Sequence, residues 1–160
     1  MERKSSNSWI DARTGNPISM MDIKKKIVKY TNLGGTVYVG ADSMLCSSTC
    51  SFASVIAFHN NDLNIATYFY KKNKLTEEKF KDVKVKILHE VNLALEAAQF
   101  VTEVCPQAKL EIHVDISTKK KHLTSRLYST VKGWVGGLGF ILKVKPDSWA
   151  SSSIADWHTK

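Results

Sequence analysis

Two short apolar runs in this chain each end in an aspartate, and a long amphipathic stretch lies between them. Residues 36–41, Thr-Val-Tyr-Val-Gly-Ala, precede Asp42, and an alternating run from Leu110 precedes Asp115. Residues of these types favour strands in a sheet. A charged group closing an apolar strand is costly to bury unless something neutralises it, and a divalent metal ion would do so. If the two strands are parallel neighbours, both aspartates lie at the edge where open sheets bind ligands.

The periodicity of hydrophobic residues predicts the remaining helices and strands. Ser19 is expected to cap a helix that ends at residues 32–35, and Thr76 a long amphipathic helix that runs to about Val101. Further strands are expected at 51–59, 63–70 and 140–145, the first two joined by a turn at 60–62, and further helices at about 123–135 and 148–158. Residues 8–17 are expected to be an irregular lead-in, and Trp157 to lie on the buried side of the last helix.

This order of elements predicts an α/β protein with a five-stranded mixed sheet flanked by helices. The 160 residues, 43% of them hydrophobic, are expected to form one domain around a single core. Within that domain, residues 1–35 supply the lead-in and first helix, and residues 36–160 supply the core.

The charge and the cysteine content narrow the functional classes. A formal net charge of +8 favours a polyanionic partner such as nucleic acid. The N-terminal residues lack the apolar region of a secretory signal, and no apolar run is long enough to span a membrane, so we expect a cytoplasmic protein. The three cysteines are expected to be free thiols, and no second compact ligand pair completes a structural zinc site.

Three further acids complete a candidate site. Glu90 lies near the middle of the long helix and reaches the sheet edge if that face of the helix packs inward, whereas Glu96 points elsewhere. Asp147 follows the last strand, and Asp156 lies in the final helix. Taken singly, each acid is ordinarily a solvated residue. As an ordered set of hard oxygen ligands they indicate Mg²⁺ or Mn²⁺, held in pairs for phosphodiester hydrolysis by water.

The chain resembles the ribonuclease H-like superfamily, and more closely its YkuK-type family. The resemblance rests on Val-Gly-Ala-Asp-Ser at 39–43, Ile-His-Val-Asp-Ile at 112–116 and the closing block from Lys145 to Lys160, whose Lys-Pro-Asp and Ala-Ser-Ser segments are the most specific. It implies a ribonuclease H-like fold in which Asp42, Glu90, Asp115 and a fourth acid bind two Mg²⁺ and act in catalysis. Both Asp147 and Asp156 are candidates for the fourth acid, and Asp156 is favoured because the superfamily takes its last acid from inside the final helix.

Several other residues are weighed as parts of a nucleic-acid site. Basic clusters are available for phosphate contacts at Lys71 and Lys72 and, as the better candidate, at Lys119, Lys120 and Lys121. Tyr128, Trp134 and Trp149 are able to stack on bases, although aromatics at helical spacing more often fill a core. His89 and His158 are expected to be surface residues.

Three functions remain open from the sequence. The leading hypothesis is a metal-dependent nuclease, a hydrolase acting on RNA, an RNA:DNA hybrid or structured DNA. The alternative is a non-catalytic nucleic-acid-binding module on the same fold, which would bind in a salt-dependent way without cutting. A third is a small-molecule phosphohydrolase, which the basic clusters disfavour.

Overall fold

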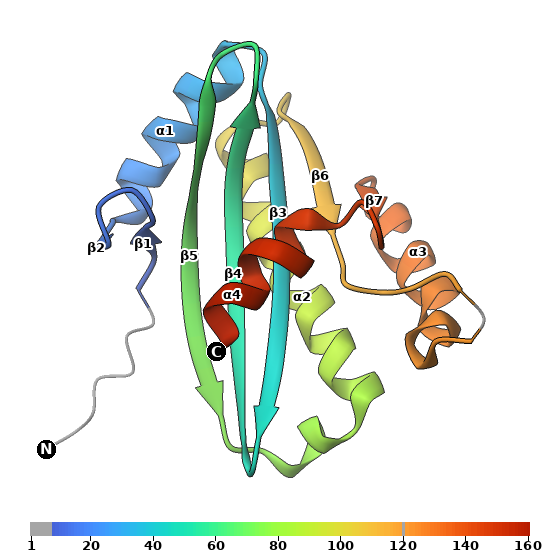
Figure 1. The fold of residues 1–160 in the computed structure, drawn as a ribbon. Coiled ribbons are helices and arrows are strands. Elements are labelled where there is room, and N and C mark those ends of the chain that lie inside the picture. Colours follow the sequence, from blue (N-terminus) through green and yellow to red (C-terminus); the bar gives the residue numbers. More distant parts are fainter. Residues whose placement is uncertain (1–7, 120) are drawn as a thin grey trace, which may run out of the picture.

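The computed structural model describes residues 8–119 and 121–160, which form a seven-stranded mixed sheet with helices on both faces (Figure 1). The strand order is β2-β1-β5-β4-β3-β6-β7. The strands are β1 (Ile10–Asp11), β2 (Asn16–Pro17), β3 (Thr36–Cys46), β4 (Thr49–Asn60), β5 (Ile65–Leu75), β6 (Lys109–His113) and β7 (Ile141–Lys143). The helices are α1 (Met20–Asn32), α2 (Val83–Val104), α3 (Tyr128–Gly137) and α4 (Asp156–Thr159), with short 3₁₀ segments η1 (Glu78–Lys81) and η2 (Leu123–Leu127) and a π-helical segment η3 (Ala150–Ala155).

The helix starts follow side-chain capping. Ser19 Oγ accepts a hydrogen bond from the Asp22 N–H at 3.1 Å, which confirms the expected start of α1. The expected cap at Thr76 is wrong. The chain first forms η1, where Phe80 is buried against Phe52, and α2 begins only after Asp82, whose Oδ1 accepts the Lys84 N–H at 2.9 Å.

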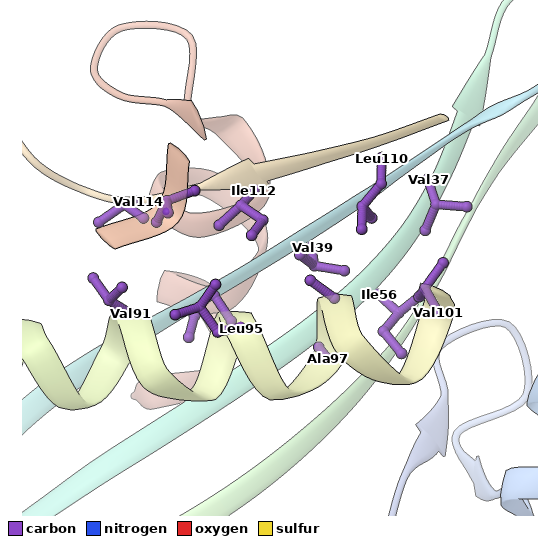
Figure 2. Close-up of a cluster of buried hydrophobic side chains, with 14 of the residues drawn as sticks. Val37, Val39, Ile56, Val91, Leu95, Ala97, Val101, Leu110, Ile112 and Val114 are labelled. Atoms are coloured by element: carbon purple, nitrogen blue, oxygen red, sulfur yellow. The ribbon is translucent and has the colours of Figure 1, made fainter. Parts of the chain in front are cut away.

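The alternation of side chains along β3 gives the sheet two different faces. Val37 and Val39 point to the inner face, which α1 and α2 cover, and Figure 2 shows the apolar side chains of α2 packed against those of β3, β4 and β6 there. Tyr38, Gly40 and Asp42 point to the outer face. In Figure 1 the C-terminal segment η3 and α4 crosses this outer face at about mid-height.

The pairing of β3 differs between its two sides. On one side it pairs antiparallel with β4 over nearly all of its length, from Val37 to Cys46. On the other side it pairs parallel with β6 only from Thr36 to Gly40, because β6 ends at His113. The adjacency of these two strands is as the sequence analysis required, but β3 continues past Asp42 instead of ending there. On the side toward β6, residues 41–46 therefore have no strand partner in the described part of the chain, and we call this a free strand edge.

The sheet has seven strands, whereas five were expected from the sequence. Residues 10–11 and 16–17 are not an irregular lead-in but a small hairpin that joins the sheet, with Ile10 opposite Tyr70 and Asp11 opposite Phe69. In addition, β5 runs on to Leu75, so Lys71 and Lys72 lie inside a strand. No helix within the described residues has the length and apolar character to cross a bilayer.

Candidate active site

Asp42 lies on the outer face of β3, two residues beyond the last residue that pairs with β6. Its side chain is only 6% exposed because the C-terminal segment covers this part of the strand. A buried carboxylate at a free strand edge has few backbone donors to satisfy it, which makes this position a point of attraction for a cation.

Glu90 reaches the same edge from the inner face. It lies on α2, is 3% exposed, and accepts a short hydrogen bond from Ser43 Oγ. Since Ser43 follows Asp42 and points to the opposite face, Asp42 and Glu90 lie on either side of one strand edge. The expected inward orientation of Glu90 is therefore what the structure has, while Glu96 is exposed and bonded to Asn92.

Asp115 follows the end of β6, next to the free edge of β3. Lys145 Nζ lies 3.0 Å from Asp115 Oδ1 and forms an ion pair with it. That oxygen is shielded from water and accepts no hydrogen bond from the described residues. A metal ion at this oxygen would therefore take the place of Lys145 as the positive charge beside Asp115.

The two candidates for the fourth acid occupy different places. Asp156, the first residue of α4, lies close enough to Asp42 for their charges to repel, and Lys160 Nζ lies 3.2 Å from Asp156 Oδ2. Asp147 is exposed, and its charge acts on His113 rather than on Asp42 or Glu90. The structure thus brings together Asp42, Glu90, Asp115 and Asp156 and leaves Asp147 outside.

Burial and mutual repulsion raise the pKa of two of these acids. The pKa of Asp42 rises to about 7, first because burial disfavours its charge and then because of Asp156 and Asp115. The pKa of Glu90 rises to about 8, again first through burial and then through the negative charge of Asp42. The charged form of both groups is therefore disfavoured near neutral pH unless a positive charge lies beside them.

The backbone of the C-terminal segment lies directly on β3. A Cβ atom at Gly40 would lie 2.8 Å from the Ser151 nitrogen, so only glycine permits this approach. Ser151 Oγ donates to the Ala41 carbonyl at 2.6 Å. His113 Nδ1 accepts the Ala150 N–H at 3.1 Å, and burial lowers the pKa of His113, so the ring is neutral and its Nε2–H donates to Glu111.

These anchoring contacts position Asp156 and were missed from the sequence. In the sequence, Gly40 and Ser43 stand out only as part of the motif at 39–43, and Ser151 stands out only as part of the closing block from Lys145 to Lys160. The signal that marks Gly40 is a glycine inside a β-branched strand, which often indicates a close backbone approach.

The donor set fits a hard divalent cation. All four acids offer carboxylate oxygens, Asp115 Oδ1 has no hydrogen bond, and two of the acids have raised pKa values that a cation would reverse. As they stand, however, no three Asp, Glu, His or Cys side chains among residues 8–119 and 121–160 converge closely enough to enclose a metal ion. Ser43 donates to Glu90, Lys145 pairs with Asp115 and Lys160 pairs with Asp156, and these groups take up oxygens that a metal ion would otherwise use.

The remaining predicted residues fall into different environments. His89 is half-buried, since its ring packs edge-on against Phe52 and beside Phe80. His158 is half-buried as well, stacked on Tyr70 and hydrogen-bonded to Tyr68 at 2.9 Å. Both histidines therefore have intermediate exposure, and the expectation of surface residues holds only in part.

The lysines of the two basic clusters lie in different environments. Lys72 points to the outer face, whereas Lys71 points to the inner face and lies over the Trp9 ring. Lys119 and Lys121 are exposed beyond Asp115, and Lys120 lies outside the described residues.

The aromatic residues differ from expectation mainly at one position. Tyr128 and Trp149 are half-buried, and Trp149 packs against Tyr38. Trp134 is 36% exposed on α3. Trp157, expected on the buried side, is instead 73% exposed. The four-residue helix α4 turns Asp156 and His158 toward the sheet and leaves Trp157 in solvent.

Comparison with known sequences identifies the protein family to which the chain belongs. The sequence model of the family described as ribonuclease H-like matches residues 19–160, which include all four acids of the cluster. The chain therefore belongs to this ribonuclease H-like family, and the resemblance to its YkuK type is confirmed. Neither the search of curated proteins nor the search of solved structures gives a match.

The raised pKa of Glu90 predicts how stability depends on pH. Because the folded pKa lies above the unfolded value of about 4.5, the folded state holds the extra proton between these values, and stability falls as pH rises through this window. Glu90→Gln removes the charge and keeps an acceptor for Ser43. We expect the variant to match the parent near pH 5 and to exceed it by about 2 kcal/mol at pH 8, measured by urea unfolding in chelator. Glu96→Gln on the exposed side of α2 is the control, and an equal difference at both pH values would contradict the assignment.

Proposed function

We propose that this protein is a metal-dependent nuclease that hydrolyses phosphodiester bonds of nucleic acid. The observation that carries the proposal is the meeting of Asp42, Glu90, Asp115 and Asp156 at one free strand edge, with raised pKa values for the two most buried acids. Membership in the ribonuclease H-like family and the net charge of +8 support nucleic acid as the ligand. A cytoplasmic location is part of the same proposal.

Each acid has a distinct part in this proposal. Asp42 and Asp115 supply oxygens from adjacent parallel strands, Glu90 from α2, and Asp156 from α4. Mg²⁺ or Mn²⁺ bound there would supply a Lewis acid for the phosphodiester and lower the pKa of water. The chain itself fixes the carboxylates, since Ser43 orients Glu90 and the anchored C-terminal segment positions Asp156. Lys145 neutralises Asp115 when no cation does so.

The non-catalytic module remains the second candidate, because one observation favours it. Lys145 already pairs with Asp115, and the described acids do not enclose a metal ion as they stand. In this alternative, the Lys145 ammonium group permanently takes the place of a metal ion. The four acids then form part of a binding surface and take no part in catalysis.

A cleavage assay separates the two candidates. Labelled single-stranded RNA, an RNA:DNA hybrid and a branched DNA are incubated with the protein and Mg²⁺, Mn²⁺ or chelator, beside the Asp115→Asn variant. The nuclease predicts cutting that needs metal and is lost in the variant. Salt-dependent binding with no cutting under any metal would establish the non-catalytic module instead.

A further inference from the structure

The outer face of the sheet is covered only on one side of Asp42. From Tyr38 to Gly40, η3 and α4 cover the face, and Ala155 is buried there among Ala53, Val55 and Ala57. The strands β3, β4 and β5 run on past this segment (Figure 1). Met44, Lys72 and Lys74 are exposed on this half. We name this uncovered part of β3, β4 and β5 the open half.

The open half is positively charged. Asp42 is the only acidic residue in β3, β4 and β5, so no other carboxylate of these strands opposes the lysines. Lys72 lies in register with Asp42, since Asp42 pairs with Ala53 and Ala53 pairs with Lys72. Two strand spacings separate the two residues, or about 10 Å. Lys74 lies two residues farther along the same face.

Trp157 belongs to α4, which packs on β3, β4 and β5, and its neighbour His158 lies near enough to Lys72 of the open half for that charge to lower the pKa of His158, after the larger effect of burial. Its other neighbour Asp156 faces Asp42, and the ring of His158 is stacked on Tyr70. Trp157 itself is 73% exposed, the highest value among the exposed large hydrophobic residues described. Exposing an indole to water has no benefit for packing, and tryptophan is a highly buried residue on average. An exposed indole between two residues that contact the sheet is available to stack on a flat ligand.

We propose that the open half and Trp157 together bind one unpaired nucleic-acid strand next to the acid cluster. Lys72 and Lys74 contact its phosphates, and Trp157 stacks on an unpaired base adjacent to the linkage that faces Asp42. A basic surface combined with an aromatic ring is the usual composition of single-strand sites, and every base has a face to stack. This inference rests on the proposed function for the role of Asp42, and it names the substrate class as single-stranded.

The stacking contact selects against a continuous duplex. In a duplex each base is already stacked between its neighbours, so its face is not available to an indole without unstacking. An RNA:DNA hybrid would therefore have only the phosphate contacts. The binding difference between a single strand and a hybrid should then depend on Trp157 and not on the lysines.

Binding in chelator tests the inference without cleavage. Fluorescence anisotropy is measured with labelled oligouridine and with a blunt RNA:DNA hybrid of equal length. Trp157→Ala is expected to weaken oligouridine binding by about tenfold or more and hybrid binding little, while Trp157→Phe retains most of the affinity. Lys72→Gln is expected to reduce the slope of log affinity against log salt by ~0.7. Trp134→Ala on α3 and Lys25→Gln on α1, both outside the site proposed here, are matched controls that should leave both quantities unchanged.

The possible results are distinct for the two proposals. Oligouridine binding that is the same in Trp157→Ala and Trp134→Ala, or tighter binding of the hybrid, would overturn the single-strand site. If the single-strand site holds but no metal supports cutting of oligouridine, the nuclease fails and the binding surface stands. If cutting depends on Asp115 but neither Trp157 nor Lys72 affects binding, the nuclease stands and this inference fails.

Discussion

Asp42→Asn should abolish metal-dependent cleavage and at the same time make the protein more stable at pH 8. The loss of activity is expected to be at least about 10³-fold, because the variant loses the anionic oxygen at the centre of the cluster and with it several kcal/mol of charge stabilisation. The gain in stability follows from the pKa of about 7. Since this value lies above the ordinary value of 3.8, ionising Asp42 in the folded state destabilises the parent as pH rises through this range.

Initial cleavage rates and thermal unfolding at pH 5 and pH 8 check both parts of this prediction. The unfolding temperatures of the variant and the parent should agree at pH 5 more closely than at pH 8. Asp147→Asn is the matched control, because Asp147 is an exposed aspartate outside the cluster. Cleavage by Asp42→Asn at the parent's rate would remove the nuclease proposal. A variant that unfolds more easily at pH 8 would remove the electrostatic account of the site.

Gly40→Ala should destabilise the fold and disconnect the C-terminal segment from β3. The added Cβ would lie 2.8 Å from the Ser151 nitrogen and 2.9 Å from the Ala150 carbonyl carbon, and both are backbone atoms that cannot rotate away. We expect a loss of about 1–3 kcal/mol, as for other overpacked cores. Since Asp156 depends on this contact for its place beside Asp42, cleavage should fall as well.

Urea unfolding and limited proteolysis near residue 150 measure this effect. Gly133→Ala is the control, because a Cβ at Gly133 meets no atom within 4 Å and the residue lies inside α3. That variant should gain about 0.5–1 kcal/mol through helix propensity. If Gly40→Ala keeps the stability and cleavage rate of the parent, then the close backbone approach does not position Asp156.

The elements that the sequence predicted well are those with a strong local signal. The start of α1 at Ser19 and the central strands followed from a capping residue and β-branched runs. The small hairpin of β1 and β2 could not be found this way, because two-residue strands exist only through pairing with β5. The start of α2 was misplaced because the burial of Phe80 keeps residues 78–81 in a separate turn.

The candidate site was predictable in its acids but not in its supporting contacts. Asp42 and Asp115 follow apolar runs, and the phase of α2 was enough to turn Glu90 inward. Asp156 could only be favoured by resemblance, since its position depends on η3, and no local pattern distinguishes a π-helical Ala-Ser-Ser-Ser segment from an α-helical one. The exposure of Trp157 depends on the same local geometry, which is why it was predicted wrongly.

The short pairing between β1 and β5 affects how strongly separate molecules of this protein associate through the edge of β5. Because β1 pairs with β5 only at Phe69 and Tyr70, residues 71–75 of β5 pair with β4 on one side and have no strand partner on the other side among the described residues. An unpaired strand edge of this length is a template for association between molecules. Three of the five residues there are lysines, and like charges on a strand edge keep a second copy from pairing with it. Changing Lys72 and Lys74 together to remove substrate contacts would therefore also make the protein more prone to aggregate.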